Sequence, residues 1–164
     1  MAVISERIAT PLPGKTNLTI SRAKALAAII QRAGGLARVF KAAYGEGAGN
    51  IHLYASFKDF THAAHSATVA SQDPEMAAWQ AARDAEPSSH MKGPYIYRTM
   101  YGKAAAKPGI MQREYTISRG NLAGALALMP ELQAVVGDNP IEAIVPTVAP
   151  HMDSLGIAYY FDSL

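Results

Sequence analysis

The 164-residue chain carries 15 basic and 13 acidic residues, a net charge of +2, and no cysteine. Disulfides, thiolate nucleophiles and cysteine-ligated metals are therefore excluded, and the absence of a basic block argues against nucleic-acid binding. No run of about 18 apolar residues could span a membrane, and Glu6 and Arg7 interrupt the stretch that a signal peptide would keep apolar. We expect a cytoplasmic globular protein with neither a nucleic-acid nor a membrane partner.

The first half of the chain predicts the order strand, helix, strand, strand, helix, strand. Alternation predicts the first strand at residues 3–9, and a helix follows that Gly34 and Gly35 end. The segment GEGAGN joins strands at residues 37–44 and 51–55, which is typical of a hairpin. The buried face of the first helix is expected to comprise Leu18, Ala25, Leu26, Ile29 and Ala33.

The second helix is predicted within FKDFTHAAHSATVASQDPEMAAW, residues 57–79. Ser56 and Asp59 fit a capping box, and Asp73 with Pro74 is a second start signal inside the segment. His62 and His65 lie opposite a small apolar face that we expect to pack, so an exposed histidine face is the favoured interpretation. Metal or haem binding by this pair is the alternative, although no cysteine or acidic cluster completes a metal shell. The expected packed face comprises Phe60, Ala63, Ala64, Ala67 and Ser71.

The rest of the chain predicts a strand in PYIYRTMYG, residues 94–102, and then the order strand, helix, strand, strand. The strands are expected at residues 110–117, 141–148 and 155–161. The helix begins near Gly120, and Pro130 must kink or restart it. Pro146 removes a donor from its strand, which we therefore expect at a sheet edge or at a bulge.

Two sequence matches indicate an internal repeat. Gly14 matches Gly120 at an offset of 106 residues, and Phe57 in FKDF matches Phe161 in FDSL at an offset of 104. The repeated TISR tetrapeptide has a different offset that would superpose unlike elements, so we interpret it as coincidence. The pattern predicts a tandem duplication, with units at residues 1–105 and 106–164 packed as one body, and with the second helix and fourth strand lacking from the second unit.

The segments REYTISRGNLAGAL, FKDF, DPEMAAW and FDSL, with this element order, resemble the dimeric α+β barrel superfamily and most of all its NIPSNAP-like branch. The resemblance implies an α+β fold in which tandem ferredoxin-like units, βαββαβ and βαββ, form a pseudo-dimeric barrel around a pocket. A barrel one strand short would expose an edge and favour a homo-oligomer. Relatives include cofactor-free monooxygenases, cyclases, isomerases and haem proteins, so the fold does not decide the function.

The strands carry the candidate site residues. Tyr95, Tyr97, Thr99 and Tyr101 alternate onto one face of their strand, which favours an aromatic pocket for a flat, mostly apolar ligand. His52 is the only histidine inside a predicted strand and is the expected general acid or base. For any single tyrosine, strand propensity with a satisfied hydroxyl is the favoured interpretation. The expected catalytic residues are His52, Arg98 and Tyr97, and the expected ligand-binding residues are Tyr54, Tyr95, Tyr101, Arg113, Tyr115 and Tyr159.

Three functions fit this sequence. The first is a cofactor-independent enzyme, similar to a monooxygenase, cyclase or isomerase, that acts on an aromatic or polyketide-like molecule. The second is a non-catalytic binding or oligomeric assembly protein. The third is a haem-binding protein that uses His52, His62 or His65.

Overall fold

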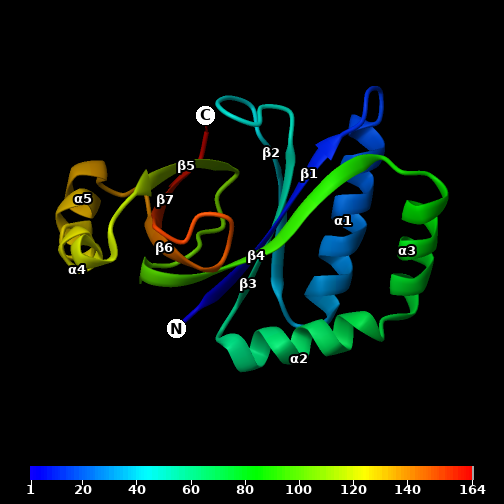
Figure 1. Cartoon of the computed structure of the whole chain (residues 1–164), viewed down its shortest axis with the longest axis horizontal. Coiled ribbons are helices and arrows are strands. Elements are labelled where there is room, and N and C mark those ends of the chain that lie inside the picture. Colours follow the sequence, from blue (N-terminus) through cyan, green and yellow to red (C-terminus); the bar gives the residue numbers. More distant parts are fainter. Residues whose placement is uncertain (164) are drawn as a thin grey trace. The chain divides into compact units, whose positions relative to one another are not determined.

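The computed structural model describes residues 1–163, and its strands follow the hydrogen-bonded order β2-β3-β1-β4-β6-β7-β5 (Figure 1). The predicted order of seven strands is confirmed for residues 1–163, but the second and third predicted helices are each divided in two, at the restart signals Asp73–Pro74 and Pro130. β4 begins five residues before the predicted strand. In chain order the elements are β1 (Val3–Pro11), α1 (Thr16–Arg32), β2 (Leu36–Lys41), β3 (Ile51–Phe57), α2 (Phe60–Ser71), α3 (Pro74–Ala85), β4 (Ser89–Gly102), β5 (Gly109–Thr116), α4 (Arg119–Ala127), α5 (Met129–Val136), β6 (Ile141–Val148) and β7 (Ser154–Phe161).

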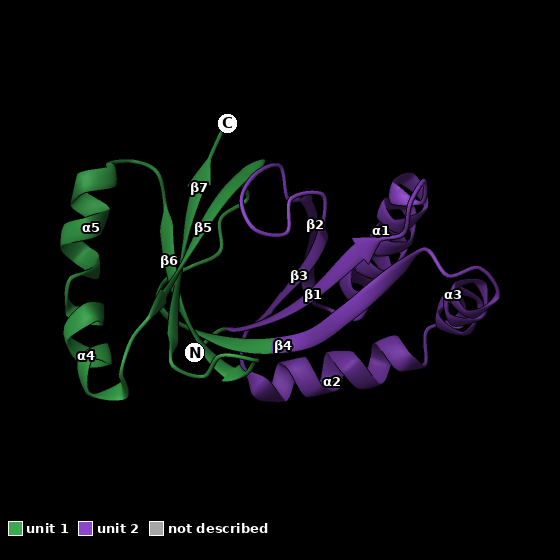
Figure 2. Cartoon of the chain, turned by 45° about the horizontal axis from the view of Figure 1, so that its top comes forward, with its two compact units in different colours: residues 1–2, 96–164 green, residues 3–95 purple. Residues whose placement is uncertain are grey.

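The chain divides into two compact units (Figure 2). Unit 2 is Val3–Tyr95, and unit 1 is Met1–Ala2 with the chain from Ile96 onward. The division falls inside β4 rather than after Ala105, because the second half of that strand pairs with β6. The first half of β4 thus belongs to unit 2 and its second half to unit 1.

In unit 2, α1 is covered on two sides. Leu26 and Ile30 pack on buried residues of β2 and β3, including Leu53 and Phe57. Ile29 and Ala33 pack against α2 and α3 and are buried with Ala70. The predicted buried face is therefore right for Leu26, Ile29 and Ala33. It is wrong for Ala25, which is exposed because it lies on the side of α1 that neither the sheet nor α2 and α3 cover.

Helix α2 differs from its prediction in its cap and in its buried face. Asp59 itself is the N-cap, and its carboxylate accepts the His62 backbone N–H at 2.8 Å, so Ser56 is not the cap. The fully buried residues of α2 are Ser66 and Ala70, two small residues one turn apart that allow close packing. The expectation of a packed face is right for Ala63, which packs against the core of unit 2, but wrong for Phe60, which is 51% exposed, and for Ala64, Ala67 and Ser71, which are also exposed.

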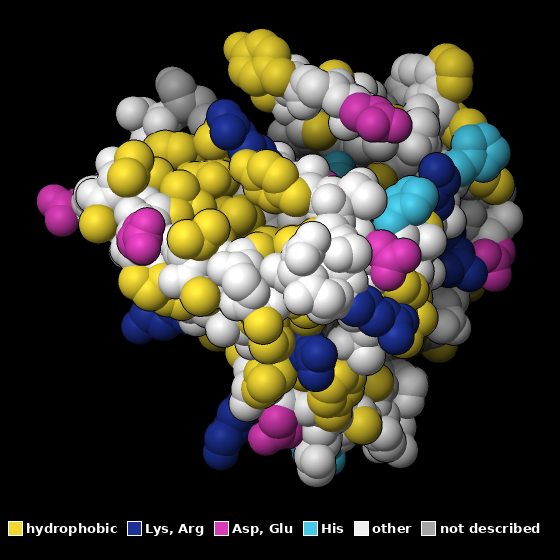
Figure 3. Space-filling view, turned by 60° about the vertical axis from the view of Figure 1, so that its left-hand side comes forward, with side chains coloured by type: hydrophobic (Ala, Val, Ile, Leu, Met, Phe, Trp, Pro, Cys, Tyr) yellow, Lys and Arg dark blue, Asp and Glu magenta, His cyan; other side chains and the backbone are white. Residues whose placement is uncertain are grey.

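In unit 1, α4 and α5 cover one face of the sheet formed by the second half of β4 with β6, β7 and β5. Their inward residues pack on a core that includes Met129, Ile141 and Ile157. Pro130 lies at the start of α5, as expected of a residue that restarts a helix. Hydrophobic side chains also gather on the outward surface of this part of the chain (Figure 3).

Strand β6 corrects the expectation of an edge strand. It pairs with β4 on one side and, from Ile141 to Ile144, with β7 on the other, and the pairing with β7 ends before Pro146. Pro146 lies opposite Tyr97, beside a register shift between Ile96 and Tyr97. The alternative expectation, a bulge at the proline, is therefore confirmed.

The pairing registers of the two units correspond at the offsets found in the sequence. Val3 pairs with Phe57 and Gly109 pairs with Phe161, so one pair maps onto the other by adding 106 to the first number and 104 to the second. Arg38 pairs with Tyr54, and adding 104 to both gives the observed pair of Glu142 with Ala158. Two independent strand pairings therefore repeat in the same register.

Candidate functional site

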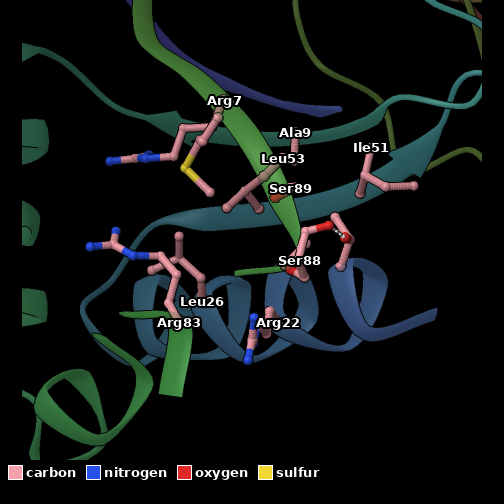
Figure 4. A pocket seen from close by; sticks show the side chains of 12 residues that line it. Arg7, Ala9, Arg22, Leu26, Ile51, Leu53, Arg83, Ser88 and Ser89 are labelled. Carbon is pink, nitrogen blue, oxygen red and sulfur yellow. Dashed lines mark hydrogen bonds between the residues drawn. The ribbon is translucent and has the colours of Figure 1, made fainter. Parts of the chain in front are cut away.

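A hollow of about 40 Å³ opens in unit 2 between α1, the helix-covered face of β1 and β3, and the start of β4 (Figure 4). Its floor is apolar, because alternate residues of β1 and β3 point toward α1. Ala9, Leu26, Ile51 and Leu53 form this floor, and Thr19, Ser88 and Ser89 add hydroxyl groups. The hollow therefore combines an apolar surface with a few polar groups, as small-molecule sites do.

Arg7 is the charged residue that β1 places in this hollow. It follows Val3 and Ser5 on the helix-facing side of the strand and is half-buried. Its Nη1 donates a hydrogen bond to Ser5 Oγ at 3.2 Å, and burial lowers the pKa of the guanidinium. Among residues 1–163 the structure records no carboxylate paired with Arg7. An arginine stays charged in a protein, so Arg7 presents a partly desolvated cation to the hollow.

Two further arginines line the same hollow. The Arg22 guanidinium donates to the backbone carbonyls of Ala82, at 2.8 Å, and of Glu86. Arg83 pairs with Asp84 at 3.0 Å, and its guanidinium carbon lies 5.3 Å from the centre of the Trp79 ring. Arg7 and Arg83 extend toward the same side of the hollow (Figure 4). Their positive charge favours a ligand with a carboxylate, phenolate or polarised carbonyl oxygen.

The opposite face of the same strands carries a second polar cluster, formed by Glu6, His52 and Tyr54. Glu6 Oε1 lies 2.9 Å from His52 Nδ1, and the Glu6 side chain is only 5% exposed, against 21% for His52. An ionised carboxylate is only an acceptor, so this contact assigns the proton to Nδ1 and leaves Nε2 as an acceptor. The His52 and Tyr54 rings stack at 5.9 Å, and the Phe40 ring meets Tyr54 edge-on at 6.1 Å. The cluster therefore joins an oriented imidazole to an aromatic surface.

These two clusters cannot belong to one site. His52 lies between Ile51 and Leu53 in β3, and both neighbours point into the hollow. Successive side chains of a strand point to opposite faces, so the sheet separates His52 from Arg7. His52 and Tyr54, both expected to line the ligand pocket, therefore do not line the hollow that contains Arg7.

Strand β4 departs from the expected alternation of tyrosines. A register shift between Thr99 and Tyr101 places Met100 as an extra residue. Thr99 is buried and bonds Glu142, whereas Tyr101 packs with the helix-side core of unit 1. The expectation that Thr99 and Tyr101 share one face is therefore wrong, because the bulge reverses the phase. Tyr95 and Tyr97 are half-buried and Arg98 is exposed.

Arg113, Tyr115 and Tyr159 lie together on the helix-covered face of unit 1. Tyr159 is 6% exposed within the core, and the Arg113 guanidinium carbon lies 5.9 Å from its ring centre. Burial raises the pKa of Tyr159, and the hydrogen bond and charge of Tyr115 raise it further. Arg113 and Tyr115 share a face as the alternation predicts, but Tyr159 contributes to packing in this core.

Sequence reasoning missed a buried carboxyl group in unit 1. Glu142 is 1% exposed and accepts hydrogen bonds from Thr99 Oγ1 and Tyr160 Oη, both at 2.7 Å. Burial raises the pKa of Glu142, and those two bonds with the Ala104 backbone N–H oppose the rise. The sequence does contain a signal for this residue, because Glu142 is the acid within the apolar run IEAIV. Glu6 is a similar case, since it lies between Ile4 and Ile8 on the same face of β1. A charged residue at an apolar position of a strand indicates a buried partner.

The two histidines of α2 differ in their exposure to solvent. His62 is half-buried, its ring lies 5.9 Å from Phe57, and its Nδ1 accepts the Lys58 backbone N–H at 3.2 Å. His65 is exposed, so the expectation of an exposed face holds for it and is wrong for His62. Within residues 1–163, no three histidine, aspartate or glutamate side chains are grouped for a metal ion. Over the same range, no helix has the length and apolar character needed to cross a membrane.

Two solved structures have a fold similar to that of this chain. A "putative monooxygenase" from Fusobacterium nucleatum matches with a TM-score of 0.65 at 7% identity, over 98% of this chain and 76% of that one. A "putative monooxygenase" from Lactobacillus acidophilus matches with a TM-score of 0.60 at 8% identity, over 98% of this chain and 77% of that one. No family model and no curated protein sequence matches. At such low identity the likeness shows a shared mixed α+β fold and leaves the chemistry to the side chains.

Proposed function

We propose that the protein binds a small organic molecule in the hollow of unit 2 and that a negatively charged or carbonyl oxygen of this ligand pairs with Arg7. The observation that carries the proposal is the half-buried Arg7, paired with no recorded carboxylate among residues 1–163, above an apolar floor. The hollow has room for a head group of the ligand, and the body extends past Arg83 and Met91. A flat aromatic acid or phenol has this combination of charge and apolar surface.

Tryptophan fluorescence tests this site, because Trp79 is the only tryptophan and lies under Arg83. We expect salicylate to change the emission in a saturable manner and salicylamide to bind at least tenfold more weakly. Arg7→Met keeps an apolar stem without the charge, and it should weaken salicylate binding about tenfold, as expected for a charge-assisted hydrogen bond. Lys24→Met, on the exposed side of α1, is the matched control. Equal affinity of the wild type and Arg7→Met for salicylate would refute the role of Arg7.

We infer a second candidate activity, acid–base catalysis by His52, from its contact with the buried Glu6. Nε2 can take a proton from a phenol or from a carbon next to a carbonyl, and Glu6 stabilises the imidazolium that results. Proton removal of this kind begins cofactor-independent oxygenation, cyclisation and isomerisation alike. The name that the two solved structures share favours oxygenation among these, with Tyr97 and Arg98 as further candidates.

A screen of phenolic and polyketide-like compounds, read by oxygen uptake and by absorbance, tests this activity. His52→Gln and Glu6→Gln should each lower turnover by about 100-fold or more, within the usual contribution of general acid–base catalysis. Both should leave salicylate binding in the hollow unchanged, because they lie on the other face of the sheet. Unchanged turnover in His52→Gln would exclude the histidine as the acid or base. A haem titration without a Soret band would exclude the haem alternative.

We further propose that the chain arose by tandem duplication within the NIPSNAP-like branch. The repeated registers support this, since the offsets of 106 and 104 between strand pairs match those between sequence landmarks. The second copy then lacks the polar pair of the first, because His52 maps to Gly156 at an offset of 104. The proposed chemistry therefore belongs to unit 2 alone.

A further inference from the structure

Helices α4 and α5 present an unusual outward face. Val135 is 83% exposed and Leu128 is 55% exposed, and the residues around them are small. At 100° per residue these side chains fall on one side of the helix pair, opposite the residues that pack on the sheet. The outward face comprises Gly120, Ala123, Gly124, Ala127, Leu128, Glu131, Ala134 and Val135, and we call it the α4–α5 face.

The corresponding face of α1 is covered by helices. The offset of 106 that relates β1 to β5 maps Leu26 and Ile30 onto Leu132 and Val136, and all four pack on their own sheets. The same offset maps Ile29 onto Val135. Ile29 is 1% exposed because α2 and α3 cover it, whereas no helix among residues 1–163 covers Val135. The α4–α5 face is thus the counterpart of a surface that, in unit 2, accepts a helix.

The charges at the two ends of this face indicate what covers it. Arg119 begins α4, and Asp138 follows the end of α5, so the segment has one basic and one acidic end. Arg119 is 83% exposed, and its contact with Asp153 is long, at 4.0 Å. When two such segments pack antiparallel, Arg119 of each copy lies opposite Asp138 of the other. Small residues allow the close approach of helices that this packing requires.

We propose that the α4–α5 face binds the same face of a second copy of this chain, antiparallel and about a two-fold axis. Such an interface is self-complementary, as a two-fold dimer requires. Leu128 lies near the middle of the segment and therefore near the axis, and Val135 packs toward the small residues of the partner's α4. Glu131 is the one charge within the face, and the two copies of it lie near the axis, where like charges repel.

Sedimentation velocity of the 164-residue chain over 1–200 µM in low salt tests the dimer. We expect a reversible monomer–dimer equilibrium, which Val135→Asp or Leu128→Asp weakens at least 30-fold. Both side chains are more than half exposed in the monomer, so these variants should keep the wild-type circular dichroism and melting temperature. Val69→Asp, at a partly exposed valine of α2, is the matched control and should dimerise as the wild type does. Glu131→Gln should strengthen the dimer about threefold.

A charge exchange tests the antiparallel arrangement. Arg119→Glu alone and Asp138→Arg alone should each weaken the dimer about tenfold, because each places like charges at both ends. An equimolar mixture of these two variants should dimerise as the wild type does, since both ends then pair opposite charges. A strict monomer at 200 µM would overturn the proposal. A dimer unaffected by Val135→Asp and Leu128→Asp, or one weakened instead by substitutions along the β5 edge, would also overturn it.

Discussion

Units 2 and 1 repeat the same strand pairings but differ in what covers their helices. In unit 2, α1 lies between a sheet and the pair α2 and α3, so Ile29 is buried on the side away from the sheet. In unit 1, the sheet is the only element within residues 1–163 that covers α4 and α5, and the matching Val135 is exposed. The same helix position is therefore part of the core in unit 2, as Ile29, and part of the exposed surface in unit 1, as Val135.

The polar residues of the two units differ in a parallel way. Glu6 contacts a histidine that remains 21% exposed and able to meet a ligand. Glu142 is enclosed by the hydroxyl groups of Thr99 and Tyr160 and is 1% exposed. A buried carboxyl group bonded to two hydroxyls stabilises packing, whereas one that orients an accessible imidazole can support chemistry. This difference favours unit 2 as the location of the proposed acid–base chemistry and a structural role for Glu142.

The largest expected effect concerns the two matched helix positions. Ile29→Ala should lower the free energy of unfolding by about 3 kcal/mol, because it opens a cavity between α1 and the covering helices. Val135→Ala should change it by less than about 0.5 kcal/mol, because the side chain already contacts solvent. Urea denaturation at 1 µM or below measures both. Equal losses for the two variants would contradict the difference in covering.

A smaller effect concerns Glu142. Glu142→Ala should cost about 2 kcal/mol, because Thr99 and Tyr160 lose a buried acceptor. The raised pKa means that the folded protein holds this proton more tightly than the unfolded chain does. The contribution of Glu142 to stability is therefore fully present below its ordinary pKa of 4.5 and is lost as the pH rises through the raised value. In Glu142→Gln this part of the pH dependence should disappear, and a pH profile identical to that of the wild type would contradict the assignment.

The elements were predictable from local patterns, but the faces were not. Asp73 and Pro74 marked the start of α3 correctly, and the Asp73 carboxylate accepts the Glu75 N–H at 2.9 Å. The packed face of α2 depends on how this helix fits against α1, and a helical wheel of α2 carries no information about that contact. The phase of β4 reverses at a bulge that arises from pairing with β6, a strand about 40 residues away in sequence.

The candidate site was predictable in part. The prediction that His52 lies in a strand and shares a face with Tyr54 is confirmed, but β4 also contains a histidine, His90, which lies outside the strand predicted from the sequence. Its partner Glu6 comes from β1, and only the register of β1 with β3 brings the two together. Arg7 is not among the predicted site residues, because an arginine in a strand usually pairs with an acid. The hollow brings Arg22 of α1 and Arg83 of α3 to line the same space as Arg7, and this arrangement depends on tertiary packing that the sequence does not show.

The most direct test of the central claim, that the ligand site is the hollow of unit 2, is a methyl NMR titration with salicylate. Leu26, Ile51 and Leu53 line the hollow, whereas Ile4 and Ile8 lie on the opposite face of β1. We predict saturable shifts at the first three residues, a midpoint at about tenfold higher salicylate concentration in Arg7→Met, and unchanged signals from Ile4 and Ile8. Shifts at Ile4 and Ile8 without shifts at Leu26 and Leu53, or no shifts at all, would contradict the account.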